Sequence, residues 1–392
     1  MAECYGNILR MKTILVLLTS TDIVRTEVLS GVREFAQGTD WEITHVDFDG
    51  SPMPVRDLIK FWSPVGCIVE ATGDGASEKT IPKNSFGGVP VVYIGGDSHI
   101  TPQNATCVVH DAVAAGETAG RELMALGLEN FAFVGMSGRN WSRRRADAFA
   151  AALRMNGKRL STMDVNPGGK DNQRLQSWLG NLAKPCGLFA ASDSIAATVL
   201  SVCRRIGIDV PNDIAVVGVD DNAALCTSTS PTLSSIHPDF RQGGRLAARL
   251  LARKLSRRGK VPPTTVFAIS GIVRRGSTRR FKRKDAWVAS ALERIWKQDG
   301  VRLSPKDVVA DFPCSRRNAE IRFRRATGHS ILDEITNARV DTAKRILSET
   351  SLPISSVAEQ CGYVSIAHFR DAFRSATGVN PLAWRKQNVR NA

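Results

Sequence analysis

The chain has 392 residues, 43% of them apolar, which is enough for two or three domains with cores of their own. No apolar run approaches the roughly 18 residues that a membrane helix needs. The eight cysteines form no Cys-x-x-Cys pair and the six histidines are dispersed. We therefore expect a reduced, cytoplasmic protein with no metal site, no disulfide framework and no cofactor. Because catalytic signatures such as His-Glu-x-x-His, Gly-x-Ser-x-Gly and the Walker loop are absent, we expect no enzyme.

Charge is unevenly distributed along the chain. Residues 1–240 contain 21 Lys and Arg against 26 Asp and Glu, whereas residues 241–284 contain 15 basic residues and no acidic one. Residues 285–392 contain 17 basic and 12 acidic residues. The basic excess at this junction and in the tail indicates nucleic acid as a partner, although an ordinary solvated basic surface would have the same composition.

The first 275 residues alternate continuous apolar runs with stretches of helical periodicity. The runs read as strands are 13–20, 41–48, 65–71, 89–95, 105–111, 130–136, 186–192, 214–220 and 264–270. The first run follows Arg10 and Lys12, so a secretory signal is an alternative. A buried strand is favoured because no small-residue cleavage site follows before Asp22. Continuous strands separated by helices predict a doubly wound α/β architecture with parallel sheets.

Polar side chains follow several of these strands. They are Ser20, Thr21 and Asp22, then Asp97, then Ser192 and Asp193, then Asp220, Asp221 and Asn222. Each alone reads more simply as a helix cap. In parallel sheets, however, ligands bind beyond the carboxyl ends of the strands, so the recurrence of polar residues there indicates a cleft for a small polar molecule.

Three segments resemble the ribose-binding and lactose-repressor type of sensor domain. They are VVHDAVAAGETAGRELMALG (108–127), WSRRRADAF (141–149) and ASDSIAATVLSVCRRIGIDVPNDIAVVGVDDN (191–222). The resemblance implies a two-lobed, periplasmic-binding-protein-like domain that closes over a sugar. It implies Arg145, Asp193 and Asp220 as sugar ligands, and Asp22 joins them as a candidate after the first strand. Gly95 and Gly96 stand where many members of the family have an acidic residue.

The tail contains a repeat, FRRATG at 323–328 and FRSATG at 373–378. A Ser precedes the helix that ends in each copy, Ser315 and Ser365. Another helix start comes before each: one at Ser304, followed by Pro305 and Asp307, and one at Ser355 or Ser356. Each unit therefore reads as helix, tight turn, helix.

Helical periodicity separates two faces of the second helix in each unit. Phe323 and Phe373 fall on the buried face, with Ala319 and Phe369. The outward residues, which we expect to contact DNA, are Arg316, Arg317, Glu320 and Arg324 in the first unit and Ile366, Ala367, Arg370, Asp371 and Arg374 in the second. A solvated face of a small bundle is the alternative, and the repetition of the unit within a basic tail favours DNA.

Residues 285–387 resemble the DNA-binding domain of the arabinose-regulator family. The matching positions are Arg339, Ala343, Ile346 and Leu347 in the linking helix and Gly378, Pro381, Trp384 and Arg385 at the end. Pro313 and Ala319 depart from the family pattern in the first unit. The order of the two halves resembles that of the regulators of xylose operons.

These resemblances imply a sugar-sensing domain at 10–278, a basic linker at 279–288 and an all-α domain with two helix-turn-helix units at 289–388. The expected function is transcriptional regulation of a sugar operon, with activation favoured over repression and with a pentose such as xylose as effector. Expected partners are tandem major-groove operator sites, a second copy of the chain, and RNA polymerase if the protein activates, with no membrane association. A different sugar, a repressor, a transport-associated sugar-binding protein and a sugar-converting enzyme are the alternatives.

Overall fold

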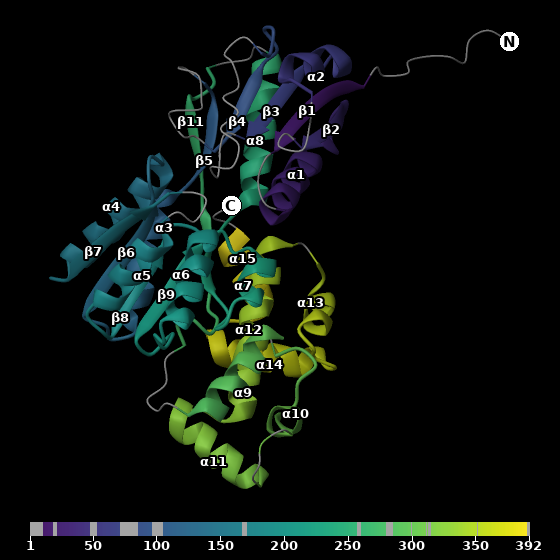
Figure 1. Cartoon of the computed structure of the whole chain (residues 1–392). Coiled ribbons are helices and arrows are strands. Elements are labelled where there is room, and N and C mark those ends of the chain that lie inside the picture. Colours follow the sequence, from purple (N-terminus) through teal and green to yellow (C-terminus); the bar gives the residue numbers. More distant parts are fainter. Residues whose placement is uncertain are drawn as a thin grey trace.

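The computed structural model describes residues 11–18, 22–47, 53–70, 85–95, 105–166, 171–256, 260–279, 285–298, 300–310, 312, 315–350 and 352–389. In these ranges the chain forms two six-stranded sheets followed by a helical tail (Figure 1). Among the helices of this part of the chain, none combines the length and apolarity required to span a bilayer.

The first lobe is a parallel sheet with strand order β11-β5-β4-β3-β1-β2. Its strands are β1 (Lys12–Leu18), β2 (Trp41–Asp47), β3 (Gly66–Glu70), β4 (Val91–Ile94), β5 (Cys107–His110) and β11 (Thr264–Phe267). The helices α1 (Asp22–Ala36) and α8 (Phe240–Ser256) cover one face, and α2 (Val55–Trp62) packs on the other. Alternate residues of β1 enter the two cores, Ile14 and Val16 one and Leu15 the other, as a strand buried on both faces requires.

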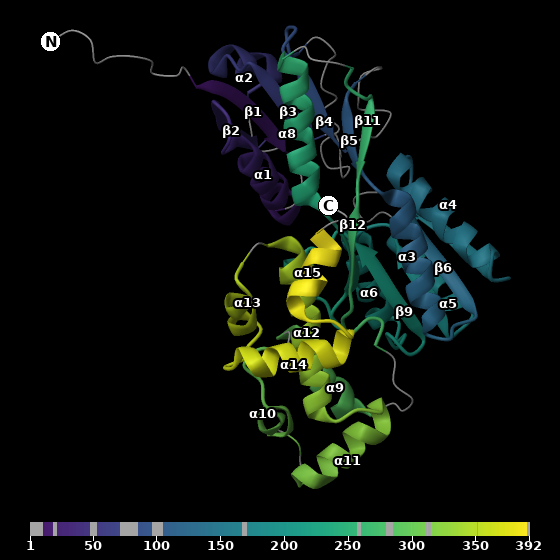
Figure 2. The ribbon, with the colours of Figure 1, turned by 180° about the vertical axis from the view of Figure 1, so that it is seen from behind.

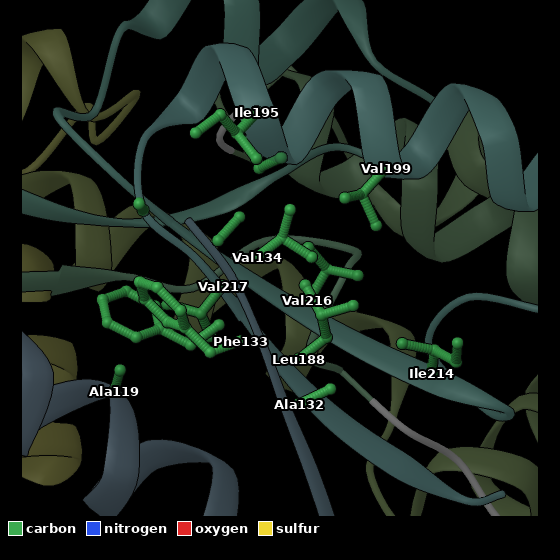
Figure 3. Close-up of a cluster of buried hydrophobic side chains, with 14 of the residues drawn as sticks. Ala119, Ala132, Phe133, Val134, Leu188, Ile195, Val199, Ile214, Val216 and Val217 are labelled. Carbon is green, nitrogen blue, oxygen red and sulfur yellow. The ribbon is translucent and has the colours of Figure 1, made fainter. Parts of the chain in front are cut away.

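The second lobe has strand order β12-β10-β9-β8-β6-β7, parallel except for β12. Its strands are β6 (Asn130–Met136), β7 (Arg159–Val165), β8 (Cys186–Ala190), β9 (Ile214–Val219), β10 (Ser234–Pro238) and β12 (Ile269–Val273). Its helices are α3 (Ala112–Ala125), α4 (Asn140–Arg154), α5 (Asn172–Asn181), α6 (Asp193–Arg205) and α7 (Ala223–Ser228). Figure 3 shows Ile195 and Val199 of α6 on one side of the strands and Ala119 of α3 on the other.

The chain passes between the two lobes three times. It leaves the first lobe after β5, returns to it between β10 and α8, and leaves again between β11 and β12. Figure 2 shows the last passage, from β11 to β12. These passages lie close to residues 111, 239 and 268. Residues next to them can therefore contact both lobes, and they include two of the histidines considered below.

The helices α1 and α8 pack unusually closely in the first lobe. A Cβ atom added at Gly31 would lie 1.9 Å from the carbonyl oxygen of Arg241, and one added at Gly244 would lie 2.2 Å from that of Val28. Both positions therefore require glycine for the two backbones to touch. This contact ties α8, which follows the second passage, to the first helix of the chain.

The tail is all helical. Its helices are α9 (Ala286–Lys297), α10 (Pro305–Val309), α11 (Arg316–Thr327), α12 (Ile331–Glu349), α13 (Ile354–Gln360), α14 (Ile366–Thr377) and α15 (Pro381–Val389). The first part of α12 joins a core with α9, α10 and α11, and its second part joins another core with α13 and α14, to which Trp384 of α15 also packs. Two small helical units therefore share one long central helix (Figure 1).

The predicted fold class is confirmed, and the predicted strands differ from the structure in three places. β7 and β10 were not predicted, because an edge strand with polar residues and a short Ser-Ser-Ile-His-Pro segment lack a continuous apolar run. The predicted strand 264–270 is two strands, β11 in one lobe and β12 in the other. The sequence pattern could not reveal that Ala268 separates two sheets.

Two expectations about the tail are also corrected. α13 begins at Ile354 with Pro353 as its N-cap, so Ser355 and Ser356 lie in its first turn and do not cap it. α9 is capped by Asp285 and begins inside the range expected to be a linker, before the expected domain start at residue 289. Pro313 lies outside the described residues.

Candidate functional sites

Arg145 is the most deeply buried cation of the interlobe region, with 2% of its side chain exposed. It projects from α4 of the second lobe, where its guanidinium lies 4.9 Å from the ring centroid of Trp141 and Nη1 donates to the carbonyl oxygen of Ala191. Its Nη2 lies 2.8 Å from Nε2 of His110, at the end of β5 in the first lobe. Arg145 therefore joins the two lobes.

His110 accepts this hydrogen bond as a neutral ring. Burial, and then the charges of Arg145 and Arg144, hold the pKa of His110 well below its usual range. A neutral imidazole has one unprotonated nitrogen, and the guanidinium has only donors, so Nε2 is the acceptor. His110 is not predictable from the sequence, because a lone His beside the helix cap Asp111 carries no pattern of its own.

Asp220 and Asp221 follow β9 and point to different partners. Both have positive φ angles, 112° and 48°, which are uncommon for residues other than glycine. Oδ1 of Asp220 lies 3.7 Å from Nη2 of Arg145, and this side chain is 30% exposed. The buried Asp221 pairs instead with Arg275, at 2.8 Å between Oδ1 and Nη1.

Asp193 lies at the start of α6 and is engaged by donors of its own lobe. Ser235 donates to Oδ1 at 2.6 Å, while the amide of Asn222 and the thiol of Cys226 donate to Oδ2 at 2.9 and 3.2 Å. Burial raises the pKa of Asp193 to about 7 even though these hydrogen bonds oppose the shift. This carboxylate fixes the loop that contains Asp220, because its partner Asn222 belongs to that loop.

A second interlobe contact involves His237, at the passage from β10 to α8. Its Nε2 lies 3.7 Å from Oε2 of Glu27 on α1, and its Nδ1 lies 3.6 Å from Oδ2 of Asp221. Both His237 and Glu27 were absent from the residues selected by sequence. Only the fold brings this histidine of one lobe beside a helix of the other.

The structure thus brings together two of the four residues expected to bind a small ligand. Arg145 and Asp220 face one another. Asp193 instead holds the loop that contains Asp220, through its bond to the amide of Asn222. The side chain of Asp22 is outside the described residues. A guanidinium and a carboxylate from different elements offer directional donors and acceptors, which suit a polyhydroxylated ligand. Among the residues described, no His, Cys, Asp and Glu cluster could hold a metal ion.

The repeated hexapeptide of the tail ends the second helix of each helix-turn-helix unit in the same way. Phe323 and Phe373 are fully buried in the two cores. Thr327 and Thr377 donate through Oγ1 to the carbonyl oxygens of these Phe residues, at 2.8 and 2.7 Å. The repeat therefore has a structural basis, because its Phe holds the helix in the core and its Thr secures the last turn.

Glycine completes each copy of the repeat. Gly328 and Gly378 have φ angles of 87° and 78°, and their amides donate to the carbonyl oxygens of Arg324 and Arg374. This left-handed C-cap is the common way in which helices end at glycine. At the other end, Ser315 and Ser365 cap α11 and α14 as predicted, and Ser304 forms the predicted capping box with Asp307.

The outward faces of α11 and α14 are exposed. The exposed members of the predicted DNA-contacting set are Arg316, Arg317, Arg324, Ile366, Ala367, Arg370, Asp371 and Arg374. Glu320 departs from the expected outward position. It is partly buried, and its Oε2 accepts a hydrogen bond from the amide of Ile331, the first residue of α12, whose N-cap is Ser330.

Two family models match the chain. Residues 99–278 match a periplasmic binding protein-like domain, and residues 308–387 match a helix-turn-helix domain. The first range contains Arg145 and Asp220, and the second contains both α11 and α14. Each match therefore coincides with one of the two sites described above.

Comparison with known proteins gives similarity over nearly the whole chain. The xylose operon regulatory protein of Escherichia coli strain K12 is 29% identical over 92% of this chain and 94% of its own, and that of Haemophilus influenzae is 26% identical over 95% and 97%. A solved structure of the xylose-binding transcription activator xylR is similar with a TM-score of 0.59 and 25% identity, over 97% of this chain and 100% of that chain. The chain is similar to these relatives across both its sensor lobes and its paired helix-turn-helix units, and it is a sugar-responsive transcriptional regulator.

Proposed function

We propose that a pentose, with D-xylose as the first candidate, binds between the two lobes and contacts Arg145 and Asp220. The observation that carries this proposal is the facing guanidinium and carboxylate, 3.7 Å apart, at a point where Arg145 also touches His110 of the opposite lobe. A sugar hydroxyl can accept from the first group and donate to the second. Closure over the sugar would then bring donors and acceptors of both lobes onto one ligand.

His110 belongs to the same proposed site. As a neutral acceptor 2.8 Å from Nη2, it fixes the direction in which the guanidinium presents its remaining N–H groups. Asp193 supports the site from behind by holding the loop of Asp220 through Asn222. Asp22 stays a prediction as a fourth contact.

On the DNA side, we propose that the exposed faces of α11 and α14 enter two major-groove segments of one operator. Arg316, Arg317 and Arg370 are the candidates for reading guanine edges, because bidentate guanidinium contacts suit that base. Arg324 and Arg374 come later in their helices and are candidates for phosphate contacts. Ile366, Ala367 and Asp371 line the same face, and Glu320 contributes by holding α12.

We propose further that the protein acts in the cytoplasm without catalytic activity. It binds repeated DNA sites as a homodimer and, as an activator, contacts RNA polymerase. Its sensor domain extends over residues 10–278, and its DNA-binding domain begins with α9, which Asp285 caps, and extends to about residue 388. The rival proposals are a repressor, a regulator of another sugar and a transport-associated sugar-binding protein. A transport protein has no use for two helix-turn-helix units, so DNA binding separates that rival from the others.

One experiment tests the proposal in two steps. Pentoses and hexoses are first screened by thermal shift, where a ligand at 100 times its dissociation constant stabilises the folded state by about 2.7 kcal/mol. An operator selected by the protein from random duplexes is then titrated with and without D-xylose. A protein that binds no sugar, or whose DNA affinity is the same with every sugar bound, contradicts the proposal.

A further inference from the structure

The sensor domain and the tail are joined by a partly buried charged contact, which we call the dock and define as Arg279, Trp296, Glu334 and Asp341. Arg279 follows β12 of the sensor and donates to Oε1 of Glu334 at 2.6 Å and to Oδ2 of Asp341 at 3.1 Å, both on α12. Its guanidinium also lies 4.8 Å from the ring centroid of Trp296 on α9. One sensor residue thus holds two helices of the tail.

Glu334 is the centre of the dock. Its Oε1 also accepts from Nε1 of Trp296 at 2.9 Å, and Glu334 is only 7% exposed. A buried carboxylate that serves two donors from different elements fixes their relative positions, because losing either donor leaves it incompletely paired. The angle between sensor and tail is therefore set where α9, α12 and the end of the sensor meet.

A second contact stands beside the dock. The amide of Thr232, in the loop before β10, donates to Oε1 of Glu293 on α9 at 2.8 Å. Gly276 passes so close that an added Cβ atom would lie 2.6 Å from Oε2 of Glu293. Burial raises the pKa of Glu293, although its bonds to Thr232 oppose the shift. α9 is therefore held to the same edge of the second lobe as α12.

The segment 274–279 connects the dock to the interlobe site. Arg275 reaches Asp221, the neighbour of Asp220, at 2.8 Å. The hydroxyl of Ser277 donates to the carbonyl oxygen of Val216 in β9 at 2.6 Å, and the amide of Ser234 in β10 donates to Oγ of Ser277 at 2.8 Å. Residues 275–278 of this segment are buried, and the segment is bonded to the two strands whose far ends carry Asp220 and His237, so it moves with them.

The dock leaves both recognition helices uncovered. Arg317 on α11 and Arg370 on α14 are exposed while all these contacts are made. The dock therefore cannot act by covering the DNA-binding surface. It acts instead on the orientation of the tail relative to the sensor. A cavity of about 440 Å³ beside it, bordered by Arg274, Arg279, Lys344 and the ends of both recognition helices at Thr327 and Ala376, leaves room for the tail to shift.

We propose that Arg279 is a positioning residue for DNA recognition, which transmits the state of the interlobe site to α12 through Glu334 and Asp341. The proposal rests on the sugar response proposed above. In either state of the sensor, the segment 274–279 moves with β9 and β10, and Arg279 carries α12 and its two recognition units along. Without the dock, the tail keeps its DNA-binding surface, but its DNA affinity no longer depends on the state of the sensor.

The test uses the full chain with Arg279→Met, which keeps an apolar stem over Trp296 and removes the charge. Glu334→Gln is the second variant, because an amide oxygen still accepts from Trp296. Arg205→Met is the matched control, an exposed arginine at the end of α6 in the same lobe. For each protein, affinity for the selected operator is measured with and without saturating D-xylose, with sugar affinity and small-angle scattering measured alongside.

We expect Arg279→Met to reduce the sugar-dependent change in operator affinity at least tenfold, with sugar affinity within twofold of the unaltered protein. Its scattering should show a broader range of distances between sensor and tail, and Glu334→Gln should shift both readouts in the same direction. The double variant should respond no less than Arg279→Met alone, since the two changes remove one contact. Arg205→Met should behave as the unaltered protein.

A normal sugar response and unchanged scattering in Arg279→Met would overturn the dock proposal while leaving the sugar response intact. If the unaltered protein itself shows no response to any sugar, the proposed effector function fails. In that case scattering alone still decides whether Arg279 holds the tail. The two failures are therefore distinguishable.

Discussion

Ser235 of β10 donates a 2.6 Å hydrogen bond to Oδ1 of Asp193, the first residue of α6. The other oxygen of the same carboxylate accepts from the amide of Asn222, in the loop that presents Asp220. Asp193 thus organises the loop from within the lobe, while Asp220 faces Arg145. The two acids that sequence reasoning treated alike occupy different environments, and two different predictions follow.

The stability of the protein should depend on pH through Asp193. Burial raises the pKa of Asp193 from 3.8 to about 7, so the folded state keeps this proton over a pH range in which the unfolded chain has lost it. The stabilisation is fully present below about pH 4 and is lost as the pH rises to about 7, at up to about 1.4 kcal/mol per pH unit. Relative to Asp193→Asn, the unaltered protein should therefore lose free energy of unfolding across this window, as measured by urea titration.

The comparison with Asn removes the contribution of the titrating groups that do not interact with Asp193, because both proteins share those groups. Parallel pH profiles for the two proteins would show that Asp193 is already ionised in the folded state at low pH. The measurement must monitor the sensor domain, since the tail has its own cores and the whole chain need not unfold in one step.

Sugar affinity should depend more directly on Asp220. Replacing Asp220 by Asn removes the charge beside Arg145 and exchanges one of the two carboxylate acceptors for an N–H donor, and should weaken sugar binding by about 1.5 to 3 kcal/mol. Operator binding without sugar should change little. Isothermal titration measures the first quantity, and Asp147→Asn, on the exposed face of α4, is the control. Unaltered sugar affinity in Asp220→Asn would place the sugar elsewhere.

Sequence reasoning reached the fold of the sensor because its strands are continuous apolar runs. It missed β7 and β10, and it merged β11 with β12, since polar edge strands and a passage between lobes leave no periodic signal. The caps of α10, α11 and α14 were predictable because capping is local chemistry. The false cap at Ser355 or Ser356 shows the limit, because Pro353 begins α13 without a side-chain bond.

The site residues likewise divide into those that the sequence could predict and those that it could not. Arg145 and Asp220 could be selected because each stands in a recognisable segment. His110, His237 and Glu27 could not be selected, since their importance lies in pairing across lobes, at 2.8 and 3.7 Å. Arg279 belongs to this class too. Residues 241–284 contain 15 basic residues, and nothing in the sequence distinguishes Arg279 as the one that contacts Glu334.

The tail should fold without the sensor. Both of its cores, from Trp287 and Val288 to Phe373 and Trp384, lie entirely within residues 285–392. This fragment should be helical by circular dichroism, unfold cooperatively and bind the selected operator without a response to sugar. A disordered fragment, or one that still responds to sugar, would contradict this division of the chain.

The hexapeptide repeat can be tested through Gly378. Its φ of 78° disfavours a Cβ atom although no atom stands within 4 Å, so strain is the main cost of Gly378→Ala. We expect a loss of about 1 kcal/mol in the free energy of unfolding of the tail. Gly378→Asn should lose less, because Asn tolerates the left-handed region. Equal losses in both variants would indicate a cause other than backbone strain.

Arg370 and Arg374 should affect DNA binding in different ways, although both are exposed on α14. Arg370 lies in the first half of the helix, where a side chain in the major groove reaches base edges. Arg370→Ala should therefore cost about 1 to 3 kcal/mol on the selected operator and relax the preference at one base pair. On scrambled DNA its effect should be small.

Arg374 lies in the last turn of α14, directly after the buried Phe373. Its carbonyl oxygen accepts a hydrogen bond from the amide of the capping Gly378. A guanidinium at this end of the helix is placed for phosphate contact, which carries no sequence information. Arg374→Ala should therefore weaken binding to operator and scrambled DNA alike and lower the salt slope by about one unit. Titrations of both variants on both DNAs at several salt concentrations separate the two roles. If Arg370→Ala weakened both DNAs equally, base reading by Arg370 would be excluded, and if neither variant changed DNA binding, α14 would not be a recognition helix.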